Sequence, residues 1–197
     1  MQNRKVNWDD VHVSNYESAA FWDVKWISKA RDLYECAKKL EPEVVRIWEN
    51  RRAVSSNESV RLQADHYQGV YFMLLSYAVE NLLKASLVAK NGSQYKEKKK
   101  FPEDLKCHDL VKLANRIDLK LEAGEEDLFR RLTRSAIWHG RYPAPLKYSD
   151  MSGVDAFLDG SKHSVSWYGE SDIERLNALI SGLPARLALD VQYWERC

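Results

Sequence analysis

The sequence predicts an all-α protein: a helical bundle of four to six helices with a long loop and a C-terminal helix. Apolar residues recur at three- and four-residue steps along most of the chain, which is the period of an amphipathic helix. Capping signals precede several of these segments. The few stretches that could form strands are too short to build a sheet core. With 45% hydrophobic and 30% charged residues, the 197-residue chain can bury a core and stay in solution.

The first predicted helix covers residues 17–40. Ser14 and Glu17 offer a capping box ahead of it. Pro42 suits the first turn of a second, shorter helix, because the amide hydrogen that proline lacks is not needed there. The apolar stripe of the first helix consists of Trp22, Trp26, Ala30, Leu33, Ala37 and Leu40.

The most apolar segment, residues 55–90, predicts the central helix of the bundle. SSNE at 55–58 supplies a capping box, and Asn91-Gly92 supplies a stop. A helix that is apolar around most of its girth is buried by its neighbours. Its main stripe consists of Tyr67, Tyr71, Leu74, Ala78, Leu82 and Ala85.

Two shorter helices are predicted beyond a polar, basic loop at 93–104. The first covers 108–117, Gly124 then breaks the chain, and the second covers 125–139 with an acidic start that suits the helix dipole. Residues 140–170 predict a long loop with room for a short strand pair around 163–168. SDIE at 171–174 caps a last helix, which we expect to bend near Gly182 and Pro184.

These segments divide the chain into three parts. Residues 1–16 form an N-terminal extension, residues 17–140 form the helical bundle, and residues 141–197 form a loop and a C-terminal helix that packs on the bundle. We find no internal repeat and no glycine-rich phosphate loop.

Composition excludes several classes of protein. Thirty basic and 29 acidic side chains nearly cancel, so the overall charge gives no sign of nucleic-acid or membrane binding. Cys36, Cys107 and Cys197 lack zinc or disulfide spacing and are expected to be free thiols in a reducing compartment. The N-terminus lacks the apolar core of a signal peptide, and no apolar run reaches the ~20 residues that span a bilayer. We therefore expect a cytoplasmic protein without membrane, metal or cofactor.

The candidate site is an R-x4-H pair, Arg134 and His139. The same spacing occurs at Arg61 and His66, but only the later pair lies in a stretch, between Asp127 and Asp150, that has no acidic residue. Such a stretch suits a phosphate-bearing ligand. Its five basic residues are Arg130, Arg131, Arg134, Arg141 and Lys147.

Helix geometry sets a condition on this pair. Five steps of a regular helix rotate by about 500°, so Arg134 and His139 would not face each other squarely. They converge if the helix unwinds at His139, which Gly140 permits, or if a partner chain completes the site across a twofold axis. A structural interpretation also stays open: Arg134 stacks on Trp138, and His139 bonds the last carbonyls of the helix.

The order of elements resembles the HEPN (higher eukaryotes and prokaryotes nucleotide-binding) domain family. A helix at 77–92 with an E-x-x-L-K-A core, a basic loop, HDLVKLANRI at 108–117 and a helix ending in R-x4-H follow one another. The resemblance covers roughly residues 17–140. It implies an all-α homodimer and a metal-independent endoribonuclease of the toxin or defence type, with Arg134 and His139 as catalytic residues. It also leaves room for an antitoxin or nucleotidyltransferase partner.

The chemistry that the resemblance implies is reasonable for these residue types. RNA can be cut by its own 2′-OH, which needs a group that exchanges protons near neutrality, such as histidine. Arginine supplies fixed charge to the phosphorane oxygens, and the product ends in a 2′,3′-cyclic phosphate. Residues expected to bind or position RNA are Arg130, Arg131, Arg141, Tyr142, Glu80 and Asn81.

The residue after the arginine supports an alternative. Active members of the family usually carry Asn, Asp or His after the arginine, where this chain has Ser135. That difference favours a non-catalytic module that binds a nucleotide, RNA or a partner protein; a purely structural dimerisation domain is a third possibility. His108 and Asp109 are interpreted as the start of a helix rather than as catalytic groups.

Overall fold

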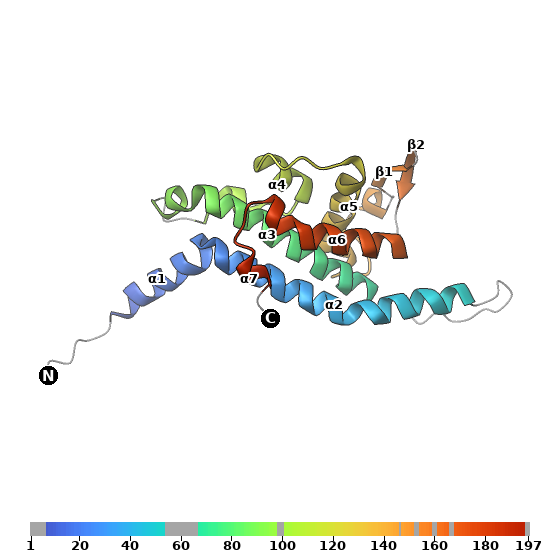
Figure 1. The fold of residues 1–197 in the computed structure, drawn as a ribbon, viewed down its shortest axis with the longest axis horizontal. Coiled ribbons are helices and arrows are strands. Elements are labelled where there is room, and N and C mark those ends of the chain that lie inside the picture. Colours follow the sequence, from blue (N-terminus) through green and yellow to red (C-terminus); the bar gives the residue numbers. More distant parts are fainter. Residues whose placement is uncertain are drawn as a thin grey trace.

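The computed structural model describes residues 7–53, 67–97, 101–145, 147–151, 154–158, 161–165 and 168–195. It is an all-α helical bundle with one small hairpin (Figure 1). The helices are α1 (Trp8–Phe21), α2 (Asp23–Ala53), α3 (Gln68–Glu97), α4 (Leu110–Arg116), α5 (Ala123–Arg134), α6 (Glu170–Arg186) and α7 (Gln192–Glu195). Short helical turns cover Glu103–Lys106, Ser135–His139 and Tyr148–Met151, and strands β1 (Val154–Leu158) and β2 (Ser161–Val165) pair antiparallel.

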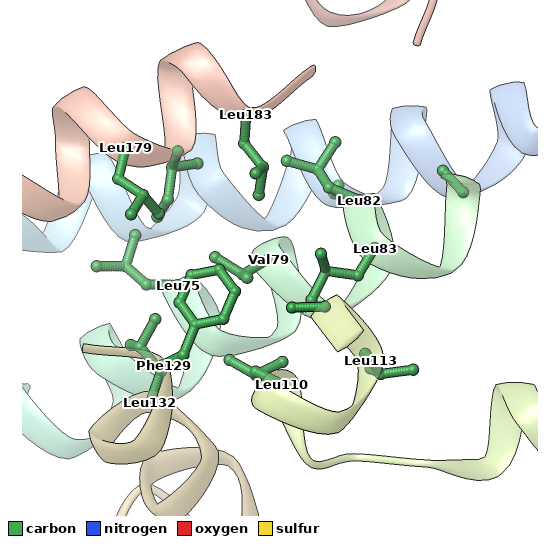
Figure 2. Packing of buried hydrophobic residues seen from close by; sticks show 14 of the residues in the cluster. Leu75, Val79, Leu82, Leu83, Leu110, Leu113, Phe129, Leu132, Leu179 and Leu183 are labelled. Atoms are coloured by element: carbon green, nitrogen blue, oxygen red, sulfur yellow. The ribbon is translucent and has the colours of Figure 1, made fainter. Parts of the chain in front are cut away.

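α3 is the central helix, as the sequence predicts. Figure 2 shows its Leu75, Val79, Leu82 and Leu83 between α6 on one side and α4 and α5 on the other. α2 packs along α3 and forms the long base of the bundle in Figure 1. Among the described helices α3 is the one long and apolar enough to cross a membrane, but 72% of its most apolar window is buried inside the bundle. A core helix has this character.

The first helices have different boundaries from those predicted. Asn7 caps α1 by accepting a hydrogen bond from the Asp9 amide at 3.2 Å, so Ser14 and Glu17 lie inside the helix and form no cap. An extended residue, Trp22, separates α1 from α2. α2 then continues through Pro42 to Ala53 as one helix. Packing of α2 along α3 compensates for the hydrogen bond that the proline removes.

α3 passes through the predicted stop at Asn91-Gly92 and ends at Glu97. Gly92 is used instead for close packing, because a Cβ there would lie 3.2 Å from the carbonyl oxygen of Phe21. The extra turn supports α1: Tyr95 is buried against Phe21, and Lys96 pairs with Glu17 at 3.2 Å. The predicted capping box at 55–58 lies outside the described residues.

The later helices also pass through their predicted breaks. Gly124 lies in the first turn of α5, which begins after Glu122. α6 begins at Glu170, before the predicted cap at 171, and Asp172 accepts the Gly169 amide at 3.0 Å. α6 then continues through Gly182 and Pro184. The hairpin lies slightly earlier than predicted, and β1 packs against α5.

One carboxylate joins three helices in the core. Glu41 of α2 accepts hydrogen bonds from Lys38 at 2.6 Å, from the Tyr71 hydroxyl of α3 at 2.8 Å and from Asn177 of α6 at 3.0 Å. Partial burial acts to raise the pKa of Glu41, but these hydrogen bonds outweigh burial and leave the pKa lowered. Burial and the same carboxylate raise the pKa of Tyr71 far above its ordinary value.

The lowered pKa of Glu41 predicts acid sensitivity. Because the folded state holds the carboxyl ionised more strongly than the unfolded state does, its stabilising effect is fully present above the ordinary carboxyl pKa of about 4.3 and is lost as the pH falls below it. We expect Glu41→Gln to lose less unfolding free energy than wild type between pH 5 and pH 3, measured by urea denaturation. Glu43→Gln, at a more exposed position of α2, is the matched control and should behave as wild type. Equal acid losses in all three proteins would contradict this account.

Candidate functional site

Arg134 and His139 lie at the two ends of a π-helical turn. α5 ends at Arg134, residues Ser135–His139 form the turn, and the Gly140 amide donates to the Ser135 carbonyl at 3.0 Å. In this geometry the backbone bond joins residues five apart, instead of the four of an α-helix. The wider turn brings residues five apart toward the same side. The helix therefore widens at these residues and does not unwind at His139.

Glycine at position 140 serves close packing rather than backbone freedom. Gly140 has φ −86° and ψ −7°, an ordinary conformation for any residue. A Cβ there would lie 2.4 Å from the Met73 Cβ and 2.6 Å from the Gly69 carbonyl oxygen, both on α3. In return, a Cβ on Gly69 would lie 2.8 Å from the His139 carbonyl oxygen. The first turns of α3 thus hold the end of the π-turn.

Tyr77 provides a second attachment to α3. Its hydroxyl donates to the Ala136 carbonyl at 3.3 Å, inside the π-turn. The turn buries Ser135 and Ala136 and leaves Ile137 53% exposed. Arg134 and His139 are half-buried, and the His139 ring packs on the Trp138 ring with centroids 5.2 Å apart. The Trp138 indole nitrogen is buried and has no hydrogen-bond partner in the described part of the chain.

Ser135 points away from the predicted site and into the core. Its hydroxyl lies 3.1 Å from the Tyr168 hydroxyl and donates to the Arg131 carbonyl at 3.3 Å. Tyr168 is itself stacked on Phe72 of α3, with ring centroids 3.5 Å apart. Burial raises the pKa of Tyr168 above its ordinary value. Ser135 therefore fastens the π-turn to the segment before α6.

Arg131, expected to bind substrate, is a core residue. It is 5% exposed and pairs with Asp127 at 2.6 Å and with Asp172 at 2.7 Å, while its guanidinium lies 4.9 Å from the centroid of the Tyr168 ring. Burial acts to lower the pKa of Arg131, but its two carboxylate partners outweigh burial and raise it. Burial acts to raise the pKa of Asp172, and its hydrogen bonds with Arg131 and the Gly169 amide lower it. The prediction for Arg131 is thus corrected, because its charge is neutralised inside the bundle.

The other predicted ligand-binding cations lie on the surface. Arg130 is exposed and pairs with Glu126, one helical turn away. The Arg141 guanidinium lies 5.2 Å from the Tyr142 ring and donates to its hydroxyl at 3.3 Å. Tyr142 is 52% exposed. Arg141 and Tyr142 follow the π-turn directly, and their amides both donate to the Trp138 carbonyl.

Glu80 and Asn81 of α3, expected to help the pair, have other recorded partners. Asn81 donates from its side-chain amide to the Tyr77 carbonyl at 2.7 Å. Glu80 is 5% exposed and binds the Lys84 amine at 2.6 Å and the His108 Nδ1 at 3.0 Å. Lys84 is buried as well, with its amine 5.9 Å from the centroid of a Trp26 ring. Glu80 is thus the centre of a separate polar cluster.

His108, which the sequence suggested only as part of a helix start, contacts α3 instead. Asp109 alone caps α4, accepting from the Lys112 amide at 3.1 Å, while the His108 ring turns toward Glu80. No spacing signal connects His108 with Glu80, because they lie on different elements. The other R-x4-H pair, Arg61 and His66, lies outside the described residues.

A cavity of about 370 Å³ lies between the first turn of α5 and α6, and neither Arg134 nor His139 lines it. Two of its lining side chains, Arg175 and Arg186, donate to the Gly124 and Lys120 carbonyls. Arg186 also pairs with Glu125. Burial acts to raise the pKa of Glu125, but the hydrogen bond from Arg186 outweighs burial and leaves the pKa lowered. Within the described residues, no group of three His, Cys, Asp or Glu side chains is placed to hold a metal ion.

Comparison with protein-family models, with curated proteins and with solved structures found no match to this chain. Its function is therefore argued from the geometry and chemistry of its own residues.

The close packing of the π-turn predicts opposite effects of alanine at two glycines. Gly140→Ala should lower the free energy of unfolding by about 2 kcal/mol, because the added methyl group meets Met73 and a backbone carbonyl. Gly182→Ala, in the interior of α6 with open space around it, should raise it by about 0.5 kcal/mol through helix propensity. Urea denaturation measures both. A neutral Gly140→Ala would show that the turn is not tightly held.

Proposed function

We propose that the protein is a metal-independent endoribonuclease of the HEPN type that uses Arg134 and His139. The observation that carries the proposal is the π-turn between these two residues, because it turns side chains five positions apart toward one side of the chain. Both side chains are half-buried, so each has surface open to a ligand. π-Turns inside helices occur frequently at functional sites.

The reaction needs few groups. The 2′-OH of one nucleotide attacks the adjacent phosphorus, its proton passes to a base, and the 5′-oxygen of the next nucleotide leaves. His139 exchanges the proton near neutral pH, and Arg134 donates hydrogen bonds to the phosphorane oxygens. The products are a 2′,3′-cyclic phosphate and a 5′-hydroxyl.

Surface charge supports a phosphate-bearing substrate. Residues 128–149 contain no acidic side chain, and Arg141 and Lys147 are exposed within them. Positive charge without nearby carboxylates attracts the RNA backbone. Tyr142, exposed and held by Arg141, offers a ring face on which a base can stack. Ile137, exposed beside the pair, suits the contact with a second copy that the family resemblance implies.

Ser135 stands where active family members usually carry Asn, Asp or His, and its side chain is buried. Its hydroxyl bonds Tyr168 in the core, so a longer polar side chain is not what orients Arg134 and His139 here. The second candidate, a non-catalytic module that binds RNA, a nucleotide or a protein, is favoured by the partners of Arg131 and Asn81. Both residues bond within the bundle and leave fewer groups for catalysis.

His139→Ala should abolish cleavage because no side chain then takes the 2′-OH proton. Purified protein is incubated with mixed RNA in EDTA, and the product ends are analysed for 2′,3′-cyclic phosphate. His12→Ala, which removes an exposed histidine of α1, is the matched control and should cleave as wild type does. Equal cleavage by wild type and His139→Ala would remove this site. Absence of cleavage by wild type on all RNAs would favour the binding module.

The binding module and the nuclease share one further expectation. Arg141→Ala should weaken RNA binding and reduce the slope of log affinity against log salt by about 1, because one phosphate contact is lost. Fluorescence anisotropy with labelled RNA between 50 and 300 mM salt measures this. Arg116→Ala, which removes an exposed arginine at the end of α4, is the control. An unchanged slope for Arg141→Ala would exclude Arg141 from the RNA-binding surface.

A further inference from the structure

The polar cluster on α3 holds a histidine in the manner of a catalytic dyad. The His108 Nδ1 lies 3.0 and 3.1 Å from the two oxygens of Glu80, and the His108 side chain is 61% exposed although Glu80 is buried. The His108 ring, whose Nδ1 is occupied by Glu80, is therefore accessible from solvent. A buried carboxylate that holds one nitrogen of a histidine and leaves the other to solvent fixes the orientation of the ring.

Lys84 forms a buried ion pair with Glu80. Its amine binds Glu80 at 2.6 Å, and both side chains are buried. An unpaired charge in the core is costly, and the ion pair with Lys84 offsets the burial of Glu80. Glu80 thus has one partner inside the bundle and one at the surface.

Contacts connect His108 with the π-turn across a single turn of α3. Tyr77, which bonds the Ala136 carbonyl, and Glu80, which bonds His108, are three residues apart and share one face of the helix. Three residues correspond to a rise of about 4.5 Å. A second connection runs through α5: the Leu110 amide, two residues after His108, donates to the Thr133 hydroxyl at 3.1 Å, and Arg134 follows Thr133.

We propose that His108 is the general acid of the ribonuclease, an inference that rests on the proposed function. When the 2′-oxygen forms its bond to phosphorus, His139 takes the 2′-OH proton. As the bond from phosphorus to the 5′-oxygen breaks, protonated His108 gives its Nε2 proton to that oxygen. The cyclic phosphate and the 5′-hydroxyl leave, and solvent returns both histidines to their starting states. Glu80 holds the His108 ring and acts as a positioning residue.

The experiment compares two leaving groups at one linkage. The first substrate is an RNA that the wild type cleaves in EDTA. The second is the same RNA with sulfur in place of the 5′-bridging oxygen at the cleaved position, because a thiolate leaves without a proton. His108→Ala should slow cleavage of the first RNA by about 100-fold or more, the size of a general-acid contribution, and slow the second RNA far less. His139→Ala should slow both.

A second variant separates chemistry from folding. His108→Gln keeps a hydrogen-bond donor for Glu80 but transfers no proton, so it should fold as wild type and share the leaving-group pattern of His108→Ala. Equal slowing of both RNAs by the His108 variants would overturn the general-acid role, and unchanged cleavage would overturn any role in the reaction. If the wild type cleaves no RNA in EDTA, so that no first substrate exists, the proposed nuclease is defeated, and this inference with it.

Discussion

A helix that is buried on most of its circumference must find a partner for each polar side chain that it carries, because an unpaired polar group in the core costs several kcal/mol. α3 meets this constraint for most of its buried polar side chains, although the Ser76 hydroxyl is buried with no hydrogen-bond partner in the described part of the chain. Tyr71 donates to Glu41 of α2, and Gln68 accepts from Trp48 at 2.9 Å. Glu80 binds Lys84 within the helix and His108 ahead of α4. Each bond fixes one neighbour against α3 both in rotation and along its length.

Aromatic stacking extends this order from α2 to α5. Trp48 stacks on Phe72 with ring centroids 6.3 Å apart, and Phe72 stacks on Tyr168 with centroids 3.5 Å apart. The Arg131 guanidinium lies over the Tyr168 ring. Because Arg131 is also held by Asp172 of α6, the column joins four segments of the chain. The π-turn follows this anchored part of α5 directly. Its position is therefore set by the core and not by the surface loop that comes after it.

The all-α fold could be predicted from the sequence because apolar periodicity reports which face of each helix is buried. The helix boundaries could not, since Pro42, Gly92 and Gly182 are local signals that long-range packing outweighs. α2 packs along α3, and Gly92 lets the end of α1 approach α3 closely, because a Cβ there would lie 3.2 Å from the Phe21 carbonyl oxygen. Propensity alone sees none of these contacts.

In the candidate site, too, some features could be predicted from the sequence and others depend on contacts between distant segments. The acid-free stretch around Arg134 is visible in the sequence, but the neutralisation of Arg131 is not, because Asp172 lies on α6. Likewise the pairing of His108 with Glu80 depends on how α4 meets α3. Side chains whose partners are distant in the chain look alike in sequence, whether they end up at the surface or in the core.

The π-turn is a local backbone feature that depends on contacts with distant segments. An α-helical continuation of α5 would satisfy the backbone equally well, yet the hydrogen bonds widen at residues 135–139 and, in the described helices, at no other place. The surrounding contacts account for this. The Ser135 hydroxyl contacts Tyr168, the Ala136 carbonyl accepts from Tyr77, and Gly140 lies against Gly69, so residues 135–140 have partners both on α3 and in the segment before α6. A regular helix would rotate at least one of them away. The packing around the wider turn also fixes the backbone positions of Arg134 and His139 at its two ends.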